Sequence, residues 1–251
     1  MNTKELAVVI MAAGKGTRMK NPDVAKVMYT IADRPMVEYV IETALHLRAQ
    51  RIVVVVGWQK QSVIDRLAKT FDSVVCVEQA PQLGTGHAVM QAEPALNGFA
   101  GDVLVLSGDV PLLTYRTTAS LIDVHRSTNA IATVLTAMLD QPTGYGRVLR
   151  DSTDHVVGIV EEKDATAEQK QIKEINSGIY VFDRHALFEG LKHITPLNAQ
   201  KEYYLTDVFQ HFWRNNLPVR AVQANEASEI RGINTLEQLE EARGVLEGRL
   251  P

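Results

Sequence analysis

The sequence of 251 residues contains a single cysteine, Cys76, so it cannot form a disulfide bond within the chain. This scarcity is typical of proteins of the reducing cytoplasm, where we expect this one to act. Cys76 stands in the apolar run 74–77, which favours a role as core filler. The seven histidines show no spacing typical of a metal site, and no apolar run approaches the length of a membrane span.

Basic charge is also scarce. Lysine and arginine number 26 against 30 aspartates and glutamates, which gives a net charge of −4 at pH 7. This balance argues against a general nucleic-acid binder and requires any anion site to be a local concentration of cations. Internal repeats, low-complexity tracts and long linkers are absent as well. A chain of this length with 45% hydrophobic residues can bury a sizeable core, as one large α/β domain or two small ones.

The stretch around which the chain is organised is residues 6–19, LAVVIMAAGKGTRM. It predicts a short apolar strand that runs directly into a glycine-rich loop. Gly14 and Gly16 can take positive φ at little cost, so successive backbone N–H groups can converge on an anion. The Arg18 guanidinium adds a planar fork of donors suited to phosphate. The stretch indicates either a polyphosphate site at the carboxyl end of the first strand or a mobile loop with solvated cations.

Two better-known phosphate loops do not match this stretch. A P-loop places Ser or Thr after its Gly-Lys pair, whereas Lys15 is followed by Gly16. The dinucleotide-binding fingerprint places a third glycine or alanine where this chain has Met19. The loop is therefore of another type.

Strand-like and helix-like segments alternate through the first half of the chain, which predicts an α/β fold with a doubly wound, mostly parallel sheet. Beyond about residue 140 the pattern changes to shorter strands joined by turns, and this indicates a small antiparallel insert. In the first half we expect strands at 6–12, 51–57, 73–78, 102–107 and 130–139, helices at 36–49, 61–71 and 117–127, and a further helix after the glycine-bearing turn 84–86. In the second half we expect insert strands at 142–151, 156–164 and 175–182, an amphipathic helix at 201–216, a strand at 218–224, and a final charged helix with Asn234 or Thr235 as N-cap.

Three polar residues near the ends of these elements each have two interpretations. Asp109 follows a buried strand, so it is either a turn residue or an oxygen ligand for Mg²⁺, which needs only one or two from a protein when phosphates and waters supply the rest. Lys26 is either a surface lysine with a buried stem or a fixed ammonium at a reacting phosphorus. Gln79 either has no role in binding or recognises uracil or thymine, because its side-chain amide can both donate and accept hydrogen bonds.

Eight segments taken together resemble one family. They are AAGKGTRM, EQAPQLGTGHAV, LSGDVPLL, PTGYGRV, GIVEEKDAT, EINSGIYVF, EYYLTD and GIN. In this order, the chain resembles the uridylyltransferase domain of bacterial N-acetylglucosamine-1-phosphate uridylyltransferases, which belong to the sugar-phosphate nucleotidylyltransferases. The resemblance covers nearly the whole length and implies a Rossmann-like nucleotidyltransferase fold.

The resemblance implies a role for each matching residue. The catalytic cations would be Arg18 and Lys26, and the Mg²⁺ ligands would be Asp109 and Asn234. The UTP contacts would come from Met11, Ala12, Ala13, Gly14, Gln79, Gly84 and Thr85. The sugar contacts would come from Ser107, Gly108, Tyr145, Gly146, Glu161 and Asn176.

By the same resemblance, a single domain would span 1–251, with a nucleotide-binding half at 1–139, a sugar-binding half at 140–234 and a C-terminal helix at 235–251. It would transfer UMP from UTP to N-acetylglucosamine 1-phosphate with Mg²⁺, and release pyrophosphate. The alternatives are uridylyl or thymidylyl transfer to another sugar 1-phosphate, such as glucose 1-phosphate, and a non-catalytic sugar-nucleotide sensor. We expect neither a nucleic acid nor a membrane as partner, and the oligomeric state is left open.

The sequence departs from the family pattern in three places. Ala25 stands where a proline usually precedes the catalytic lysine, in a segment one residue longer, and Ser107 replaces a frequent tyrosine before Gly-Asp. Bifunctional members continue into hexapeptide repeats that carry an acetyltransferase, and this sequence contains no such repeat. It is therefore expected to be either a piece of a bifunctional enzyme or a stand-alone uridylyltransferase.

Overall fold

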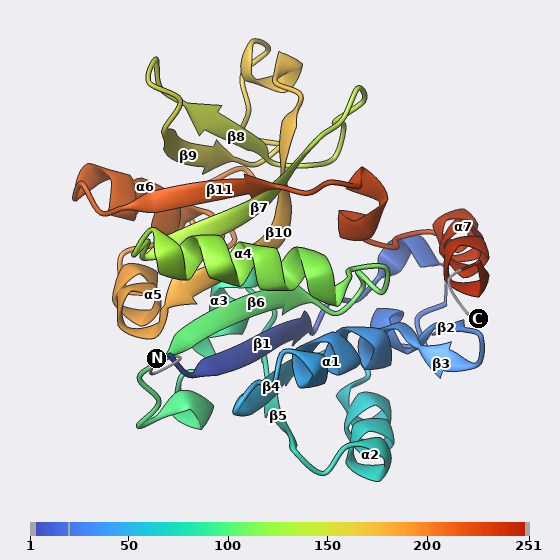
Figure 1. Cartoon of the computed structure of the whole chain (residues 1–251). Helices are drawn as coiled ribbons and strands as arrows, with labels where there is room; N and C mark the ends of the chain where they lie inside the picture. Colours follow the sequence, from blue (N-terminus) through green and yellow to red (C-terminus); the bar gives the residue numbers. More distant parts are fainter. Residues whose placement is uncertain (1–3, 20, 249–251) are drawn as a thin grey trace.

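The computed structural model describes residues 4–19 and 21–248, and within these ranges nine strands form one sheet and two short strands form another. Figure 1 shows the large sheet running through the molecule. Its strands are β1 (Leu6–Ala12), β4 (Arg51–Val56), β5 (Val74–Glu78), β6 (Asp102–Ser107), β7 (Ala132–Met138), β8 (Arg147–Arg150), β9 (Val156–Val160), β10 (Glu174–Asp183) and β11 (Val219–Gln223). The small sheet pairs β2 (Thr30–Ile31) with β3 (Arg34–Pro35).

The order of the main strands is β11-β7-β10-β6-β1-β4-β5. The strand β1 pairs in parallel with β4 on one side and with β6 on the other. The chain therefore winds outward from β1 in both directions, and a crevice opens beyond the carboxyl ends of the strands at this switch point. The expected doubly wound, mostly parallel sheet is confirmed, and its topology fixes where a ligand site can form.

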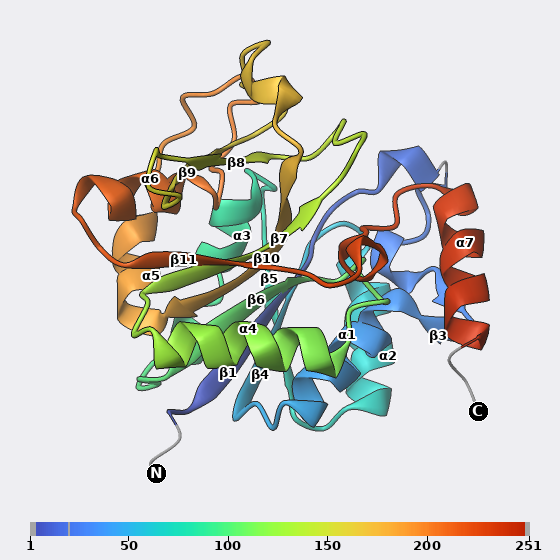
Figure 2. The same ribbon diagram turned by 45° about the horizontal axis from the view of Figure 1, so that its top comes forward.

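Helices cover both faces of the sheet, as the apolar composition of its strands requires. The helices are α1 (Met36–His46), α2 (Lys60–Thr70), α3 (Thr85–Met90), α4 (Tyr115–Ser127), α5 (Arg184–Leu191), α6 (Asp207–Arg214) and α7 (Leu236–Glu247). Alternate residues of β1 point to opposite faces: Val8 and Ile10 pack with α1, α2 and α4, whereas Ala7 and Val9 pack with α3, α5 and α6. Figures 1 and 2 show α1 and α4 on one side of the sheet and α3 and α5 on the other.

Every helix within the described ranges lacks the combination of length and apolar character that a membrane span requires.

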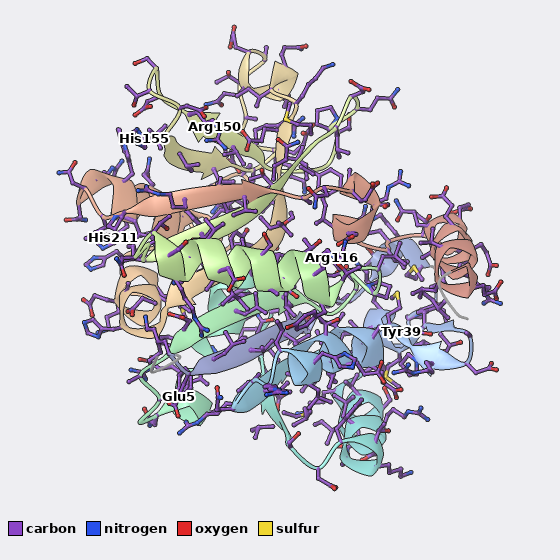
Figure 3. All side chains as sticks on the ribbon, in the orientation of Figure 1. Glu5, Tyr39, Arg116, Arg150, His155 and His211 are labelled. Atoms are coloured by element: carbon purple, nitrogen blue, oxygen red, sulfur yellow. The ribbon has the colours of Figure 1, made fainter. Side chains whose placement is uncertain are left out.

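The strands β8 and β9 form a hairpin with a polar surface. Arg150 on β8 donates to both carboxylate oxygens of Glu174, at 2.7 and 2.8 Å. In Figure 3, Arg150 and His155 lie on this hairpin near the top of the view, and Glu5 lies at the lower left.

One expected strand of the insert lies elsewhere. We expected 175–182 to be a short strand of a separate antiparallel unit, but β10 is ten residues long and sits in the main sheet, antiparallel to both β6 and β7. Its central run of apolar residues can be buried on both faces, which suits an internal strand. Only β8 and β9 lie off the main path, and β8 joins the sheet through β10. The two halves of the chain thus share one sheet.

The expected helix at 201–216 is correct only for its second part. The helix α6 begins at Asp207. The preceding residues 201–206 run along residues 79–84, the loop that leads into α3, which we call the α3 loop. Tyr203 N–H donates to Leu83 O at 2.7 Å, and Leu205 N–H donates to Thr85 Oγ1 at 3.0 Å. These long-range hydrogen bonds replace the local ones that a helix would make, so tertiary contacts override the helical pattern of this segment.

The final helix begins as expected. Thr235 is the N-cap of α7 and forms a capping box with Gln238. The helix packs Leu239 and Ala242 against Ile31 of the small sheet and against Ile233, which precedes the cap. This packing holds the segment before α7, including Asn234, against the body of the molecule. Residues 249–251 of the expected helix lie outside the described ranges.

A buried carboxylate anchors the start of the sheet. Asp102, fully buried at the beginning of β6, lies 2.7 Å from Lys4 Nζ and accepts from Arg126 Nε at 2.8 Å, with His125 Nε2 at 3.5 Å. Burial alone would raise the pKa of this carboxyl, but its contacts with His125, Lys4 and Arg126 outweigh burial and lower the pKa to about 2.

We expect Asp102→Asn to lower the free energy of unfolding at pH 7 by about 2–3 kcal/mol, the equivalent of the pKa shift. Because the pKa is lower in the folded state, the carboxylate stabilises the fold above its unfolded pKa of about 3.9, and this contribution is lost as the pH falls towards 2. Urea unfolding at pH 7 and pH 3 measures this, with the exposed Asp140→Asn as control. An equal loss at both pH values would contradict the assignment.

Candidate functional site

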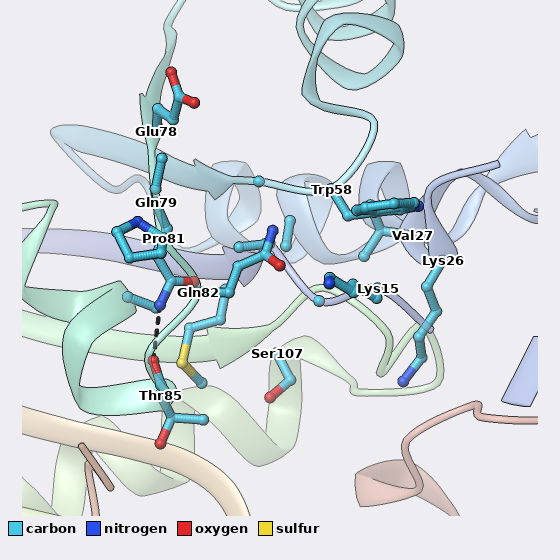
Figure 4. Close-up of a pocket in the computed structure, with 18 of the residues that line it drawn as sticks. Lys15, Lys26, Val27, Trp58, Glu78, Gln79, Pro81, Gln82, Thr85 and Ser107 are labelled. Atoms are coloured by element: carbon cyan, nitrogen blue, oxygen red, sulfur yellow. Dashed lines mark hydrogen bonds between the residues drawn. The ribbon is translucent and has the colours of Figure 1, made fainter. Parts of the chain in front are cut away.

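A cavity of about 830 Å³ opens at the carboxyl ends of β1, β4, β5 and β6, at the switch point of the sheet. Figure 4 shows its lining, with Gln79 and Thr85 at one end and Lys26 at the other. A second cavity of about 250 Å³ shares Ser107 and Asp109 with it. The two cavities therefore meet where β6 ends. All seven residues expected to bind nucleotide line the larger one, namely Met11, Ala12, Ala13, Gly14, Gln79, Gly84 and Thr85.

The glycine-rich loop packs directly against Lys26. Gly16 has a φ of +60°, and a Cβ atom added to it would lie 2.6 Å from the Lys26 Cβ. Only glycine permits this approach, which fixes the stem of Lys26 beneath the loop. A Cβ atom added to Gly14 would contact nothing within 4 Å, so Gly14 faces open space in the cavity. The loop thus holds a cation below it and leaves room for a ligand above it.

Ala25 takes the backbone conformation that the usual proline would impose. Its φ is −59° and its ψ is 134°, at the start of a 3₁₀ turn over Lys26–Met28. Proline fixes φ near −65° and favours an extended ψ before the turn, so alanine here reproduces the same entry into the turn. The Ala25 departure and the longer segment leave the lysine directed into the site.

Four side chains from three distant parts of the sequence meet at the end of β6. Lys26 Nζ contacts the carboxylate of Asp109 and donates to Asn234 Oδ1 at 2.6 Å. Arg18 Nη2 donates to the same Asn234 oxygen at 2.8 Å. Because one ammonium group touches both Asp109 and Asn234, the two oxygens converge on a space that suits a small cation. We call Asp109 and Asn234 the oxygen pair.

The backbone holds the oxygen pair in place. Gly108 N–H donates to Met11 O at 2.9 Å, and Ile233 N–H donates to Asp109 O at 2.9 Å. A Cβ atom on Gly108 would lie 3.1 Å from Val27 Cγ1 and 3.2 Å from Met11 O, so the packing leaves little room for a side chain here. These contacts tie the end of β6 to the end of β1 on one side and to the segment before α7 on the other.

Gln79 and the α3 loop form the opposite end of the cavity. The Gln79 side chain is buried, and its Nε2 donates to Gly84 O at 2.9 Å and lies 3.2 Å from His87 Nδ1. Burial lowers the pKa of His87. Gly84 has a φ of +106°, and a Cβ atom on it would lie 2.6 Å from Tyr203 O. The amide nitrogen of Gln79 thus fixes the loop, while its Oε1 atom carries no hydrogen bond within the described ranges.

The structure also brings together Gly146, Glu161 and Asn176. Asn176 N–H donates to Gly146 O at 2.9 Å, and a Cβ atom on Gly146 would lie 3.3 Å from Glu161 Oε2. Glu161 Oε1 accepts from Thr206 Oγ1 at 3.0 Å. Burial raises the pKa of the Glu161 carboxyl, and the charges of Asp207 and Asp164 raise it further, against the opposing hydrogen bond from Thr206.

Two of the residues expected to contact the sugar, Tyr145 and Ser107, lie apart from Gly146, Glu161 and Asn176. Tyr145 lines the smaller cavity with Arg18 and the oxygen pair, and burial raises the pKa of its hydroxyl. Ser107 lies where the two cavities meet. Glu161 instead lines a further cavity of about 720 Å³ between β9 and α6. The residues expected to bind phosphate, metal and base therefore line two adjoining cavities, Tyr145 and Ser107 lie at the same place, and Glu161 lines a neighbouring cavity.

Several residues at the site were not singled out from the sequence. Trp58, Gln82 and Glu202 line the large cavity, and Thr206 holds Glu161. Thr206 lies in the segment EYYLTD, which carried part of the resemblance, so that motif contained a usable signal. Gln82 lies in another of these segments, EQAPQLGTGHAV, whereas Trp58 follows β4 without a motif and only the fold places it here.

Comparison with known proteins matches the nucleotidyl transferase family model to residues 7–228. The chain is 47% identical over 247 residues to the bifunctional protein GlmU of Pelotomaculum thermopropionicum, covering 98% of this chain and 53% of the relative. It is 48% identical over 250 residues to the bifunctional protein GlmU of Syntrophotalea carbinolica, covering 100% and 53%. The chain thus spans about half the length of the curated relatives it matches.

A solved structure supports the fold. The crystal structure of UDP-glucose pyrophosphorylase complexed with UDP-glucose superposes with a TM-score of 0.76, over 98% of this chain and 100% of that one. The sequence identity is 19%, so this similarity concerns the fold alone. Together with the family match, it confirms the Rossmann-like nucleotidyltransferase fold implied by the sequence.

Proposed function

Since the chain belongs to the nucleotidyl transferase family, we propose that it transfers UMP from UTP to N-acetylglucosamine 1-phosphate and releases pyrophosphate. The observation that carries the proposal is the meeting of Lys26 with the oxygen pair, Asp109 and Asn234, below the glycine-rich loop. This corner lies between the base end of the large cavity and the smaller cavity beside it. It is the place where a nucleotide α-phosphate and a sugar phosphate can meet.

The oxygen pair suits Mg²⁺. Mg²⁺ prefers hard oxygen ligands and commonly takes only one or two from the protein, with substrate phosphates and waters completing its shell. Asp109 and Asn234 offer one carboxylate and one amide oxygen, and a cation, the Lys26 ammonium, already lies against both. When bound by these two side chains, Mg²⁺ would neutralise phosphate charge and hold the substrate phosphates in place. Groups of three or more His, Cys, Asp or Glu that could form a metal site on their own are absent from residues 4–19 and 21–248.

The reaction requires the protein mainly to supply positive charge that offsets the charge of the phosphates. The nucleophile, an oxygen of the sugar phosphate, is already anionic at neutral pH, so a general base is unnecessary. Its attack on the α-phosphorus forms a new P–O bond, breaks the bond to the β-phosphate oxygen, and releases pyrophosphate. Two anions must approach each other, and Lys26 and Arg18 reduce their repulsion while the glycine-rich loop positions the triphosphate.

The sugar would be recognised through Glu161 and its neighbours. The partly buried Glu161 carboxylate, whose second oxygen lies beside Gly146, can accept hydrogen bonds from sugar hydroxyls. The Asn176 side chain donates to Tyr180 OH at 2.7 Å and accepts from Gly178 N–H at 3.1 Å, which fixes its amide at the edge of β10. These groups favour a polyhydroxyl ligand. The choice of N-acetylglucosamine over glucose rests on the resemblance of the sequence segments rather than on this geometry.

Gln79 should make the enzyme prefer UTP to CTP. Its Oε1 can accept the N3–H of uracil, whereas cytosine presents an acceptor at N3, and that mismatch costs about 1–3 kcal/mol. We expect kcat/KM for UTP to exceed that for CTP roughly 10- to 100-fold, and Gln79→Leu to remove most of this ratio. Gln61→Leu, which alters an exposed glutamine on α2 outside the cavity lining, is the control. Equal use of both nucleotides by the wild type would refute the assignment.

The test of the proposed function is a panel of sugar 1-phosphates against all nucleoside triphosphates, with pyrophosphate release as the readout. We expect the fastest release with UTP and N-acetylglucosamine 1-phosphate. A faster reaction with glucose 1-phosphate would favour the other sugar. Binding of nucleotide sugars without any pyrophosphate release would identify a sensor. The single cysteine and the substrate UTP lead us to place the reaction in the cytoplasm.

A further inference from the structure

Trp58 forms one wall of the large cavity and contacts the glycine-rich loop at both ends. It follows β4 directly, and its backbone N–H donates to Ala13 O at 3.1 Å, just before the loop. Its indole Nε1–H donates to Pro22 O at 2.9 Å, just after the loop. Figure 4 shows the flat ring beside the Lys15 side chain. One residue thus spans the whole loop.

The residues around Trp58 reinforce this arrangement. Gln59 takes a left-handed conformation with a φ of +52°, and its Nε2 also donates to Pro22 O, at 3.1 Å. A Cβ atom on Gly57 would lie 2.6 Å from Gln82 Nε2 and 2.8 Å from Ala13 Cβ. The turn after β4 is therefore tightly packed against the loop, and the Trp58 ring has a defined position.

The ring holds a cation. Lys15 Nζ lies 5.0 Å from the centroid of the Trp58 ring, within the range of a cation–π interaction. Lys15 has no carboxylate partner within residues 4–19 and 21–248, whereas Lys26 is paired with Asp109. The net charge of the chain is negative, so an unpaired cation at the wall of this cavity is available to an anionic ligand.

We propose that Trp58 is a positioning residue that holds the Lys15 ammonium ready to bind the outer phosphates of the nucleoside triphosphate. This rests on the proposed function in one respect, the identity of the ligand. Lys26 and the oxygen pair occupy the corner proposed for the α-phosphate, which leaves Lys15 for the two phosphates that depart as pyrophosphate. Binding draws the ammonium from the indole face towards phosphate oxygens, while Trp58 keeps the ends of the loop in place.

The chain offers a direct spectroscopic test, because it contains only two tryptophans. Trp213 lies on α6, is half exposed, and does not line the large cavity. In Trp213→Phe, emission reports Trp58 alone. We expect inorganic tripolyphosphate and UTP to change this emission and UMP, which lacks the outer phosphates, to leave it nearly unchanged. Lys15→Met in the same background should abolish the response, and Lys69→Met, on the exposed side of α2, should leave it intact.

Affinity gives the second readout. Lys15→Met and Trp58→Leu should each weaken UTP and tripolyphosphate binding roughly five- to ten-fold, with UMP binding unchanged. Trp58→Phe keeps a ring face for Lys15 but loses the hydrogen bond to Pro22, so it should recover most of the loss. Because Lys15 is exposed, Lys15→Met tests the proposal even if Trp58→Leu folds poorly.

The outcomes separate this proposal from the proposed function. UTP affinity unchanged in both Lys15→Met and Trp58→Leu would overturn the positioning role. An emission change that persists in Lys15→Met would overturn it as well. Tripolyphosphate binding with the Trp58 response, but without any binding of UTP, would support the role of Trp58 and contradict the nucleotide assignment.

Discussion

Lys26→Ala should reduce the rate of the chemical step on the order of 100- to 1,000-fold while changing UTP affinity little. The charge of bound UTP is concentrated on its outer phosphates, which the glycine-rich loop and Lys15 can hold. Charge around the α-phosphorus peaks only when the sugar phosphate arrives. A cation at that point therefore acts mainly on the transition state, and such contacts raise turnover rather than binding.

The geometry of Lys26 supports this expectation. Its stem is fixed against Gly16, and its ammonium lies in the corner between the two cavities, with only 13% of the side chain exposed. Single-turnover rates and UTP affinities of wild type and mutant measure the effect, with the exposed Lys173→Ala as control. Weaker UTP binding with an unchanged chemical step would make Lys26 a ground-state phosphate anchor instead. No change in either quantity would make Arg18 the next candidate.

Asp109→Asn should reduce turnover by at least about 100-fold at fixed Mg²⁺ concentration and leave the fold intact. The substitution keeps the size of the side chain but removes the only formal charge of the oxygen pair. It also removes the charge partner of Lys26. Because the affinity of a hard cation depends on ligand charge, divalent metal binding should weaken together with turnover.

Metal affinity can be measured without turnover, by the electron paramagnetic resonance of Mn²⁺ titrated into each protein with UTP present. Asp140→Asn is the matched control, because Asp140 is exposed and pairs only with Lys173 on the surface. Unchanged unfolding in urea would show that the fold is retained. Wild-type turnover by Asp109→Asn at limiting Mg²⁺ would show that the carboxylate is not a metal ligand.

The parallel half of the fold could be predicted from local sequence because buried parallel strands are short, continuous and rich in β-branched residues. The run RIVVVV, for example, allows few alternatives to β4. The place of β10 could not be predicted in this way, since strand order depends on contacts between segments far apart in the chain. The sequence around 201–206 was misleading for a related reason. Its helical pattern is real, but hydrogen bonds to Leu83 and Thr85 determine its structure.

The residues of the candidate site differ in the same way, because some are marked by the local sequence and others are placed there only by the fold. The glycine-rich loop, Lys26 and Asp109 carry a signal in their own neighbourhood, a loop or a charge at the end of an apolar strand. Asn234 was identified as a ligand only through the resemblance, in the segment GIN, and its place beside Asp109 depends on α7 packing against the small sheet. Trp58 could not be identified as a site residue from the local sequence, because an aromatic residue after a strand is usually part of the core.

One competition experiment tests the central claim most directly. The purified chain is given UTP and Mg²⁺ with equal concentrations of N-acetylglucosamine 1-phosphate and glucose 1-phosphate, and both nucleotide sugars are quantified by mass spectrometry at low conversion. The account predicts UDP-N-acetylglucosamine as the main product, formed in equal amount to the pyrophosphate released. A predominance of UDP-glucose, or the absence of any nucleotide sugar, would contradict it.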